Sequence, residues 1–458
     1  MSMETGVDTI CAISTPQGEG GIGIIRISGS KAHDILKRLF RFKRDKGELY
    51  SHRLYLGYII DPINKKEIDE VFAVFMDAPN TYTREDVAEI YSHGGIAVQQ
   101  YILSCILRCG ARLAEPGEFT KRAFLNGRID LLQAESVLDI IKSETETELE
   151  TALSHLKGIL SQRINNIRDR IKDALVEIET QIDFSDEDIP IDLKGIISRL
   201  KETKKELASI IDSFYEGRAI KSGFEVLILG RTNVGKSSLL NALLLEEKAI
   251  VTPIPGTTRD IIEDTIHIKG IKIKLIDTAG LRRPKNLAED MGIERAKKKI
   301  EDAHVILWVL DGSEGYKKED NNVYNAIKDK NIIAVINKID LPQKLNEGPL
   351  IEKGIKPVKV SALKNIGIDN IKTHIYQNLM GRGRKRRPVI ITNLRHRDAL
   401  VRAKDSVEKG LKNLIESEPL EFVAFELNDA LYNLGLITGE TCPEEILNTI
   451  FERFCIGK

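Results

Sequence analysis

Residues 225–241 read EVLILGRTNVGKSSLLN, and this stretch decides the fold of the third quarter of the chain. It begins with a short apolar run at 226–229, which is typical of a strand that is covered on both faces. Residues 230–237 then match the pattern G-x-x-x-x-G-K-[ST] without a mismatch, and a helical pattern follows. The two glycines let backbone N–H groups converge on phosphate oxygens, and a helix N-terminus favours negative charge. The stretch predicts a P-loop in which Lys236 neutralises the β- and γ-phosphates and Ser237 holds Mg²⁺.

Two polar segments downstream supply groups that a phosphate and its metal require. The sequence PGTT at 255–258 lies among turn-forming residues, where a loop can bring the Thr258 hydroxyl to the metal. The sequence DTAG at 277–280 follows an apolar run, so Asp277 is expected at a strand end as an anchor for Mg²⁺. Gly280 is expected to offer its amide to the γ-phosphate.

Two further segments select the base. NKID at 337–340 follows another apolar run, and the Asp340 carboxylate can accept hydrogen bonds from N1–H and the 2-amino group of guanine, an arrangement that adenine lacks. SAL at 361–363 follows a third run and is expected to close over the base. Because these signals occur in the right order and at strand ends, the predicted ligand is GTP. The predicted nucleotide-binding residues are Asn233, Val234, Gly235, Lys236, Ser237, Ser238, Thr252, Pro253, Ile254, Pro255, Gly256, Thr257, Thr258, Asp277, Thr278, Ala279, Gly280, Asn337, Lys338, Asp340, Ser361, Ala362 and Leu363.

The composition bounds the class of protein. With 458 residues the chain is long enough for about three domains, and its net charge of −1 gives no global electrostatic case for nucleic acid or an acidic surface as partner. The five cysteines form no C-x-x-C pair, which suits a reducing compartment. No apolar stretch approaches the length of a membrane span, and no targeting pattern opens the sequence. We therefore expect a soluble cytoplasmic protein with no membrane segment.

Residues 1–120 have the pattern of a separate α+β domain. The glycine-rich segment 18–23 is followed by a strand pattern rather than a helix, so it predicts a turn and not a dinucleotide-binding loop. The polar clusters 81–86 and 93–95 are predicted to be loops, with a ligand site as the alternative. Strands are predicted at 9–14, 22–27, 54–60 and 71–76, and a helix at 96–109.

From residue 116 the pattern becomes helical. Between 149 and 182 apolar residues recur with an average spacing of about 3.67 residues, which predicts one straight bundle helix rather than a coiled coil. The segment 183–190 is predicted to end this helix, and 193–215 to form the next one. Residues 395–453 again have a helical pattern, and Pro419, Gly435 and Gly439 are expected to mark the ends of helices within it.

The GTP-binding segment is therefore inserted into a helical domain. The predicted fold class is multidomain α+β and α/β, with a doubly wound, mainly parallel sheet in the inserted domain. The basic run RGRKRR at 382–387 is predicted to be either a solvated linker or a contact to a nucleic-acid backbone. The predicted domain boundaries are 1–120 for the N-terminal domain, 121–218 for the first helical part, 219–381 for the GTPase domain and 382–458 for the second helical part.

Several motifs together identify a family. PNTYTRED at 79–86, HGG at 93–95, PGEFTKRAFLNGRID at 116–130, the inserted GTPase and the terminal FCIGK at 454–458 resemble the MnmE (TrmE) family of tRNA-modification GTPases. The resemblance covers the whole chain. It implies a homodimer formed through the N-terminal domains, which works with the FAD- and NADH-dependent partner MnmG in a heterotetramer. The implied reaction adds an aminomethyl or carboxymethylaminomethyl group at C5 of the wobble uridine, position 34, of certain tRNAs.

The resemblance also implies a folate one-carbon donor, either 5-formyl- or methylene-tetrahydrofolate, in the N-terminal domain. The matching residues are Arg26, Glu85, Arg128 and Lys458. Arg128 stands where some members carry lysine, which keeps the charge but changes the geometry of the contact.

The hydrolytic step is expected to differ from that of small GTPases. Leu281 stands where many of them carry the glutamine that orients the attacking water. Asn233 and the loop 252–257 are therefore expected to hold a monovalent cation beside the phosphates. The resemblance implies that this cation is K⁺, with Asn233, Thr252, Ile254 and Thr257 as its ligands. It also points to Glu289 as the residue that orients the attacking water through a second water. Lys236, from the P-loop, is the other predicted catalytic group of the GTPase.

Cys455 is a candidate nucleophile or acid–base group in one-carbon transfer, on a tail expected to reach the N-terminal domain of a partner subunit. A buried, unreactive cysteine is the alternative. Two other classes of function also stay open. One is a ribosome-assembly or other RNA-bound switch GTPase anchored by the run 382–387, and the other is a nucleotide-gated helical scaffold without modification chemistry.

Overall fold

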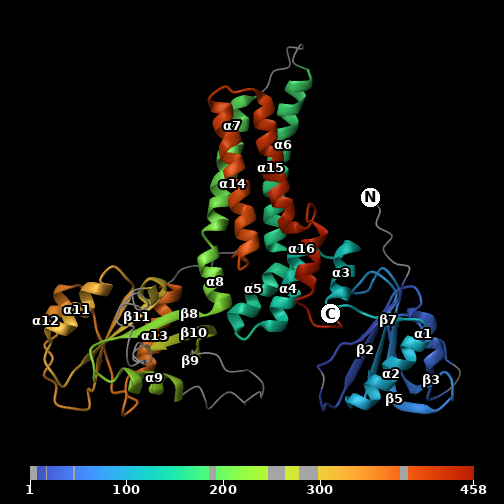
Figure 1. The fold of residues 1–458 in the computed structure, drawn as a ribbon, viewed down its shortest axis with the longest axis horizontal. Coiled ribbons are helices and arrows are strands. Elements are labelled where there is room, and N and C mark those ends of the chain that lie inside the picture. Colours follow the sequence, from blue (N-terminus) through green and yellow to red (C-terminus); the bar gives the residue numbers. More distant parts are fainter. Residues whose placement is uncertain are drawn as a thin grey trace, which may run out of the picture. The chain divides into compact units, whose positions relative to one another are not determined.

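The computed structural model describes residues 8–16, 18–44, 47–184, 192–245, 264–277, 298–381 and 390–458. They form two compact units, whose ribbons are drawn in Figure 1. The first unit comprises Met1–Ile141, Ala152–Lys205 and Ala399–Lys458, and the second comprises Lys142–Thr151 and Glu206–Asp398.

The N-terminal part of the first unit is a mixed sheet with helices on one face. Its seven strands have the order β3-β4-β5-β6-β2-β1-β7, and all neighbours pair antiparallel except β1 and β7. Helices α1 (Ala32–Leu39) and α2 (Ile96–Arg108) bury their apolar sides in a common core with the sheet. The strands are β1 (Ile10–Ile13), β2 (Gly23–Ser28), β3 (Phe40–Phe42), β4 (Arg53–Ile60), β5 (Glu67–Met76), β6 (Val87–Ser92) and β7 (Arg112–Leu113).

This arrangement confirms the predicted α+β domain and the predicted strands and helix within it. The segment 18–23 joins β1 to β2 as a turn, as expected. Segments 81–86 and 93–95 are loops on either side of β6. The sequence reasoning did not identify α1, β3, β6 or β7.

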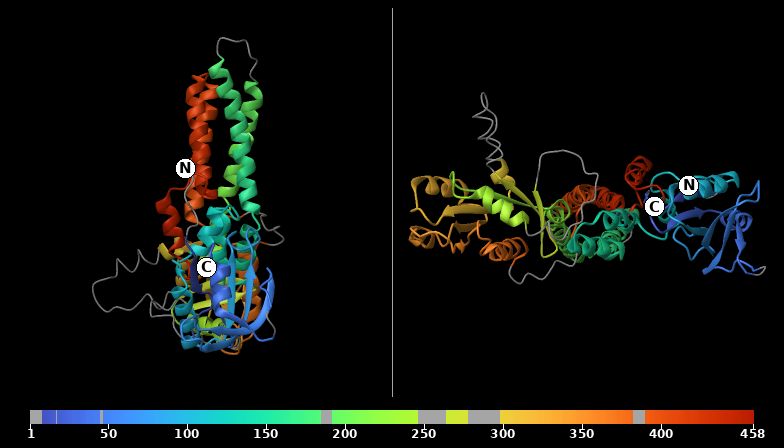
Figure 2. Two further views of the ribbon diagram at one scale, coloured as in Figure 1. Left: turned by 90° about the vertical axis from the view of Figure 1, so that its right-hand side faces the viewer. Right: turned by 90° about the horizontal axis from the view of Figure 1, so that it is seen from below.

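The helical part of the first unit brings distant segments of the chain together. Helix α6 (Ile159–Asp183) packs along α15 (Leu420–Thr438), and Figures 1 and 2 show α7 (Leu193–Ile211) and α14 (Leu394–Ile415) running beside them. A Lys204–Glu408 ion pair joins α7 to α14. Apolar residues at helical spacing, such as Ile164, Ile167 and Ile171 on α6, are buried between these helices.

Shorter helices accompany the bundle. In the first unit they are α3 (Glu118–Leu125), α4 (Leu131–Lys142) and α16 (Glu444–Phe451), whereas α5 (Glu146–Leu156) begins in the segment Lys142–Thr151 of the second unit. Leu131 and Ala134 of α4 share a core cluster with Leu447, Ile450 and Phe454 from the end of the chain. The end of the chain is thereby anchored in the first unit.

The prediction of one helix over 149–182 is wrong. Lys157 and Gly158 separate α5 from α6, and Gly158 has φ +78, a left-handed conformation that glycine adopts without a steric penalty. The predicted helix over 193–215 is also two helices, because α7 ends at Ile211 and α8 (Phe214–Ser222) begins after a turn.

Gly435 does not interrupt a helix, as the sequence had suggested, because it lies inside α15. A Cβ atom at this position would come within 2.6 Å of the Thr441 hydroxyl oxygen, so glycine is needed where the chain folds back on the helix. Pro419 and Gly439 do flank α15 as predicted.

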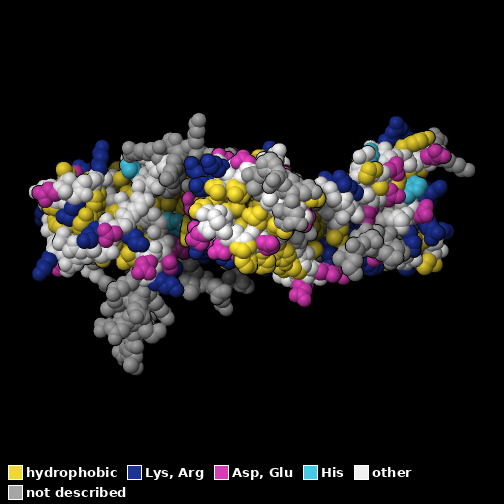
Figure 3. All heavy atoms as spheres, turned by 90° about the horizontal axis from the view of Figure 1, so that it is seen from above, with side chains coloured by type: hydrophobic (Ala, Val, Ile, Leu, Met, Phe, Trp, Pro, Cys, Tyr) yellow, Lys and Arg dark blue, Asp and Glu magenta, His cyan; other side chains and the backbone are white. Residues whose placement is uncertain are grey.

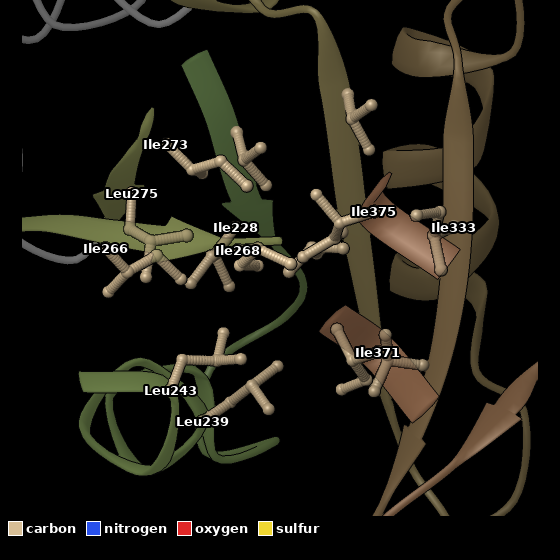
Figure 4. Packing of buried hydrophobic residues seen from close by; sticks show 14 of the residues in the cluster. Ile228, Leu239, Leu243, Ile266, Ile268, Ile273, Leu275, Ile333, Ile371 and Ile375 are labelled. Carbon is tan, nitrogen blue, oxygen red and sulfur yellow. The ribbon is translucent and has the colours of Figure 1, made fainter. Parts of the chain in front are cut away.

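The second unit contains the predicted doubly wound, mainly parallel sheet. In the described residues its six strands have the order β13-β12-β11-β8-β10-β9, and every neighbouring pair is parallel except β9 with β10. Figure 4 shows α9 and α13 packing apolar side chains against these strands, among them Leu239, Leu243, Ile371 and Ile375. The elements are β8 (Phe224–Leu229), α9 (Lys236–Leu245), β9 (Asp264–Ile268), β10 (Ile271–Asp277), β11 (Val305–Asp311), α11 (Lys318–Ile327), β12 (Ile332–Asn337), α12 (Gly348–Glu352), β13 (Val358–Lys359) and α13 (Ile368–Met380).

Candidate functional site

The P-loop lies between β8 and α9, as the sequence predicts. Gly235 has φ +91, and a Cβ atom there would lie 2.4 Å from Nδ2 of Asn337. The close approach of the loop to the base-reading segment therefore requires glycine. Lys236 Nζ donates hydrogen bonds to the carbonyl oxygens of Gly230 (3.0 Å) and Arg231 (2.7 Å), which holds the ammonium inside the loop.

Two oxygen-bearing side chains meet at the start of α9. Ser237, at the start of α9, donates a hydrogen bond from Oγ to Oδ2 of Asp277 at 3.1 Å, and Asp277 ends β10. A hydroxyl and a carboxylate are ligands that suit Mg²⁺. Parallel strands β8 and β10 are neighbours, which brings residues forty positions apart in sequence to one edge of the sheet.

The base-reading segments are tied to the P-loop through one side chain. Buried Asn337 donates from Nδ2 to the Val234 carbonyl oxygen (3.0 Å) and accepts from the Ala362 N–H at Oδ1 (3.0 Å). Ser361 Oγ donates to Oδ1 of Asp340 at 2.6 Å. These bonds fix the predicted guanine acceptor relative to the P-loop. Leu363 is exposed.

Lys338 provides a second tie that the sequence reasoning did not identify. Its Nζ donates to the Asn233 carbonyl oxygen (2.8 Å) and to Oδ2 of Asp311 (2.6 Å), at the end of β11. Burial raises the pKa of Asp311, but hydrogen bonds from Lys338 and Ser313 outweigh it and hold that pKa below its usual range. The apolar run 305–310 followed by an aspartate was the available signal for this residue.

Several predicted residues lie outside the described part of the chain. They are Thr252, Pro253, Ile254, Pro255, Gly256, Thr257, Thr258, Thr278, Ala279, Gly280, Leu281, Glu289 and the basic run 382–387.

A second cluster lies on the outer face of the N-terminal sheet, opposite α1 and α2. Arg26 of β2 donates from Nε to Oε1 of Glu89 at 2.7 Å. Its guanidinium carbon lies 5.6 Å from the centroid of the Tyr82 ring and 5.7 Å from that of Phe119. Arg128 approaches the same Tyr82 ring, at 4.8 Å. The guanidinium groups of Arg26 and Arg128, which are far apart in the sequence, thus both contact the Tyr82 ring.

Glu85 lies on the same face. It accepts a hydrogen bond from the Ser28 hydroxyl at Oε2 (2.7 Å), and Ser28 is two residues from Arg26 on β2. The structure therefore brings together three of the four residues predicted for folate. The sequence reasoning missed Tyr82, since nothing in the pattern separates it from an ordinary loop tyrosine.

The C-terminal tail lies against the N-terminal sheet of its own chain, whereas the sequence led us to expect it at the N-terminal domain of a partner subunit. The Cys455 carbonyl oxygen accepts from the Gly117 N–H at 3.4 Å, and a Cβ atom on Gly457 would lie 2.6 Å from the Ile13 carbonyl oxygen. Since Ala12 is the register partner of Arg26, the tail ends near the outer-face cluster. Lys458 is half-buried, and Cys455 is exposed, which excludes the alternative of a buried cysteine.

Among the helices of the described residues, none is long and apolar enough to cross a membrane.

Two family profiles match the chain. The profile described as "MnmE helical domain" matches residues 131–455, and that described as "GTP-binding protein TrmE N-terminus" matches residues 9–128. The chain is 46% identical over 458 residues to the "tRNA modification GTPase MnmE" of Thermoanaerobacter sp. (strain X514), covering 98% of this chain and 99% of that protein. It is 44% identical over 457 residues to the protein of the same name from Alkaliphilus oremlandii (strain OhILAs), with 98% and 99% covered.

Proposed function

The chain belongs to the MnmE family of tRNA modification GTPases, and from this premise we propose that it hydrolyses GTP to drive the modification of tRNA. The observation that supports this best is the connection of the P-loop to the guanine-reading segments through Asn337. That geometry suits binding of a guanine nucleotide whose phosphates lie at the start of α9.

In this function each group of the second unit has a defined task. Lys236 neutralises phosphate oxygens, and Ser237 with Asp277 holds Mg²⁺, directly or through water. When bound, the ion adds positive charge at the β- and γ-phosphates. We further propose that Thr258 and Gly280, outside the described residues, contact the metal and the γ-phosphate.

Leu281 replaces the glutamine that usually orients the attacking water, so hydrolysis is organised by other groups, and the charge that develops at the phosphates needs a cation where other GTPases use an arginine finger. We propose that K⁺ supplies it, bound by Asn233, Thr252, Ile254 and Thr257, and that Glu289 orients the attacking water. Asn233 has φ +63 and its carbonyl oxygen accepts a hydrogen bond from Lys338, so the backbone of the P-loop is fixed at this residue.

GTP hydrolysis is expected to be at least about 10-fold faster in K⁺ than in Na⁺ at equal ionic strength, because a positioned cation stabilises the charge of the transition state. The measurement is steady-state phosphate release in the two chloride salts, with GTP affinity determined in both as the control. Equal rates in K⁺ and Na⁺ would rule out a selective cation site.

We propose that the outer-face cluster binds a reduced folate, either 5-formyl- or methylene-tetrahydrofolate, which when bound supplies a one-carbon unit. The residues present fit such a ligand. Arg26, Arg128 and Lys458 are cations suited to its carboxylates or carbonyl oxygens, and the Glu85 carboxylate suits the N–H groups of the pterin edge. A partner of the MnmG type is proposed to supply the FAD and NADH chemistry, with which the chain adds the aminomethyl or carboxymethylaminomethyl group at C5 of uridine 34.

We propose that the outer face of β4 and β5 is the homodimer interface. Leu56 pairs with Phe72 across the two strands, and Leu54 pairs with Val74. Leu54, Leu56 and Phe72 are 57%, 40% and 47% exposed, which makes a row of apolar side chains where a solvated antiparallel sheet normally presents polar ones. A second copy of this face would bury the row.

Phe72→Glu is expected to convert the dimer to a monomer, because it places a charge in the centre of a buried apolar face. Sedimentation or light scattering at micromolar concentration measures the change. Tyr215→Glu, at an exposed aromatic of the second unit, is the matched control and should leave the mass unchanged. A Phe72→Glu chain that keeps the dimeric mass would place the interface elsewhere.

We propose that tRNA is bound by a local cluster of basic side chains, because the net charge of the whole chain, −1, does not attract nucleic acid. On the face drawn in Figure 3, Lys and Arg side chains are interspersed with Asp and Glu. The basic run 382–387 is the proposed contact with the RNA backbone.

Nucleoside analysis of tRNA from a deletion strain tests the function as a whole. Normal wobble uridines in that strain would favour an RNA-bound switch GTPase or a scaffold instead.

A further inference from the structure

The outer-face cluster contains a buried charge network. Arg122 of α3 donates from Nη1 to both carboxylate oxygens of Glu85, at 3.0 and 3.2 Å, and its side chain is only 10% exposed. From Nη2 it donates to Glu118 (2.9 Å) and to Asp8 (2.7 Å). The guanidinium is therefore fixed by three carboxylates at once, and its fork geometry leaves it little freedom.

The network is asymmetric in charge. It holds three carboxylates, of Asp8, Glu85 and Glu118, against two guanidiniums, of Arg112 and Arg122. Arg112 contacts Asp8 and Glu118 but not Glu85. Within this network, Arg122 is the ion-pair partner of Glu85. The Glu85 carboxylate lies on the same face of the sheet as Arg26.

The remaining contacts of Glu85 determine its orientation. The Ser28 hydroxyl donates a hydrogen bond to Oε2 of Glu85. The Thr81 hydroxyl donates a hydrogen bond to the backbone carbonyl oxygen of Glu85 at 2.6 Å. A carboxylate oxygen can accept two hydrogen bonds, and the contacts described leave Oε1 with one, from Arg122. A ligand N–H can therefore reach Oε1 while the arginine stays in place.

From this arrangement we infer that Arg122 is a positioning residue for Glu85: it holds the carboxylate in the orientation in which Oε1 can accept a hydrogen bond from an N–H donor of the bound folate. This inference rests on the proposed folate site and adds a residue that does not itself touch the ligand. Ser28 supports the same orientation from the other oxygen.

The test is binding of 5-formyltetrahydrofolate to the full-length chain by isothermal titration. Arg122→Gln is expected to weaken binding by about 10- to 100-fold, the range for losing the alignment of a charge-assisted hydrogen bond. Arg122→Lys is expected to recover part of this loss, because it restores the charge without the fork. Ser28→Ala, which removes no charge, is expected to weaken binding several-fold.

Two further variants separate positioning from a general effect on folding. Arg108→Gln, on α2, removes an ion pair to Asp61 and no contact of the network, so its affinity should stay near that of the wild type. In a Glu85→Gln background, Arg122→Gln should cost almost nothing more, because the group through which it acts is gone.

The outcomes are distinct. A wild-type chain that binds no folate overturns the proposed site and the inference together. If the wild type binds and Arg122→Gln binds equally well, only the inference fails. It also fails if Arg108→Gln weakens binding as much, or if Arg122→Gln weakens binding by the same factor in the Glu85→Gln background as in the wild type.

Discussion

Replacing Asp340 with asparagine is expected to weaken GTP binding by about 2–4 kcal/mol, the size of two hydrogen bonds to a charged acceptor. Asp340 follows β12, and its Oδ1 accepts from Ser361 at 2.6 Å, which holds the carboxylate toward the base-reading loop. Asparagine keeps the size of the side chain but replaces one acceptor oxygen with an NH₂ donor. This donor faces the N–H groups of guanine, so the loss combines a missing bond with a repulsive contact.

The same reasoning predicts a gain for a different base. Xanthine has a carbonyl oxygen where guanine has its amino group, so the Asp340→Asn chain should bind XTP more tightly than the wild type does. Asp329→Asn, at an exposed position after α11, makes the same chemical change away from the site and serves as the control. Titrations of all three chains with both nucleotides give the result. Unchanged GTP affinity would show that another segment reads the base.

The nucleotide site was predictable because its chemistry is local in sequence. Each motif follows an apolar run, and parallel strands carry their ends to one edge of the sheet, so order along the chain determines proximity. The bonds from Lys338 to Asp311 and from Asn337 to Val234 were not predictable, since they depend on which strands become neighbours. Strand β11 lies between β8 and β12, and that order is a tertiary property.

Two glycines show where local reasoning fails in the helical part. Gly158 lies within a regular apolar pattern that continues across it, yet it ends one helix and begins another. Gly435 was expected to end a helix, yet α15 continues through it, and the Thr441 side chain lies where a Cβ atom of residue 435 would be. Helix propensity gives both residues the same penalty. The difference is made by packing partners that the sequence does not reveal.

The outer-face cluster was only partly predictable for a related reason. Arg26 and Glu89 are 63 positions apart, and Arg122 and Glu85 are 37 apart, so no spacing rule connects them. The family resemblance named residues of this cluster, and the antiparallel pairing of β2 with β6 explains why two of its side chains share a face. The predicted domain boundaries, K⁺ ligands and roles of the site residues stay predictions.

Cys455→Ser is expected to reduce tRNA modification by about 100-fold or more while leaving GTP hydrolysis intact, the range for losing a group that acts in acid–base or nucleophilic chemistry. Cys455 belongs to the first unit, and the P-loop and base-reading segments belong to the second. The tail is held by its backbone, through the Cys455 carbonyl and the contact of Gly457 with Ile13, so the side chain can change without releasing it. Serine preserves the shape but offers a much weaker nucleophile and acid.

The assay is reconstituted modification of wobble uridine with the flavin partner, measured beside phosphate release on the same preparations. Cys109→Ser, at the end of α2, is the matched control, because it removes a partly buried thiol that lies outside both proposed sites. It should leave both activities near wild type. Lys458→Ala tests whether the tail acts through folate, since it should weaken folate binding while Cys455→Ser should not. If the Cys455→Ser chain modifies tRNA normally, the exposed thiol has no chemical part, and the one-carbon transfer belongs to the partner's flavin.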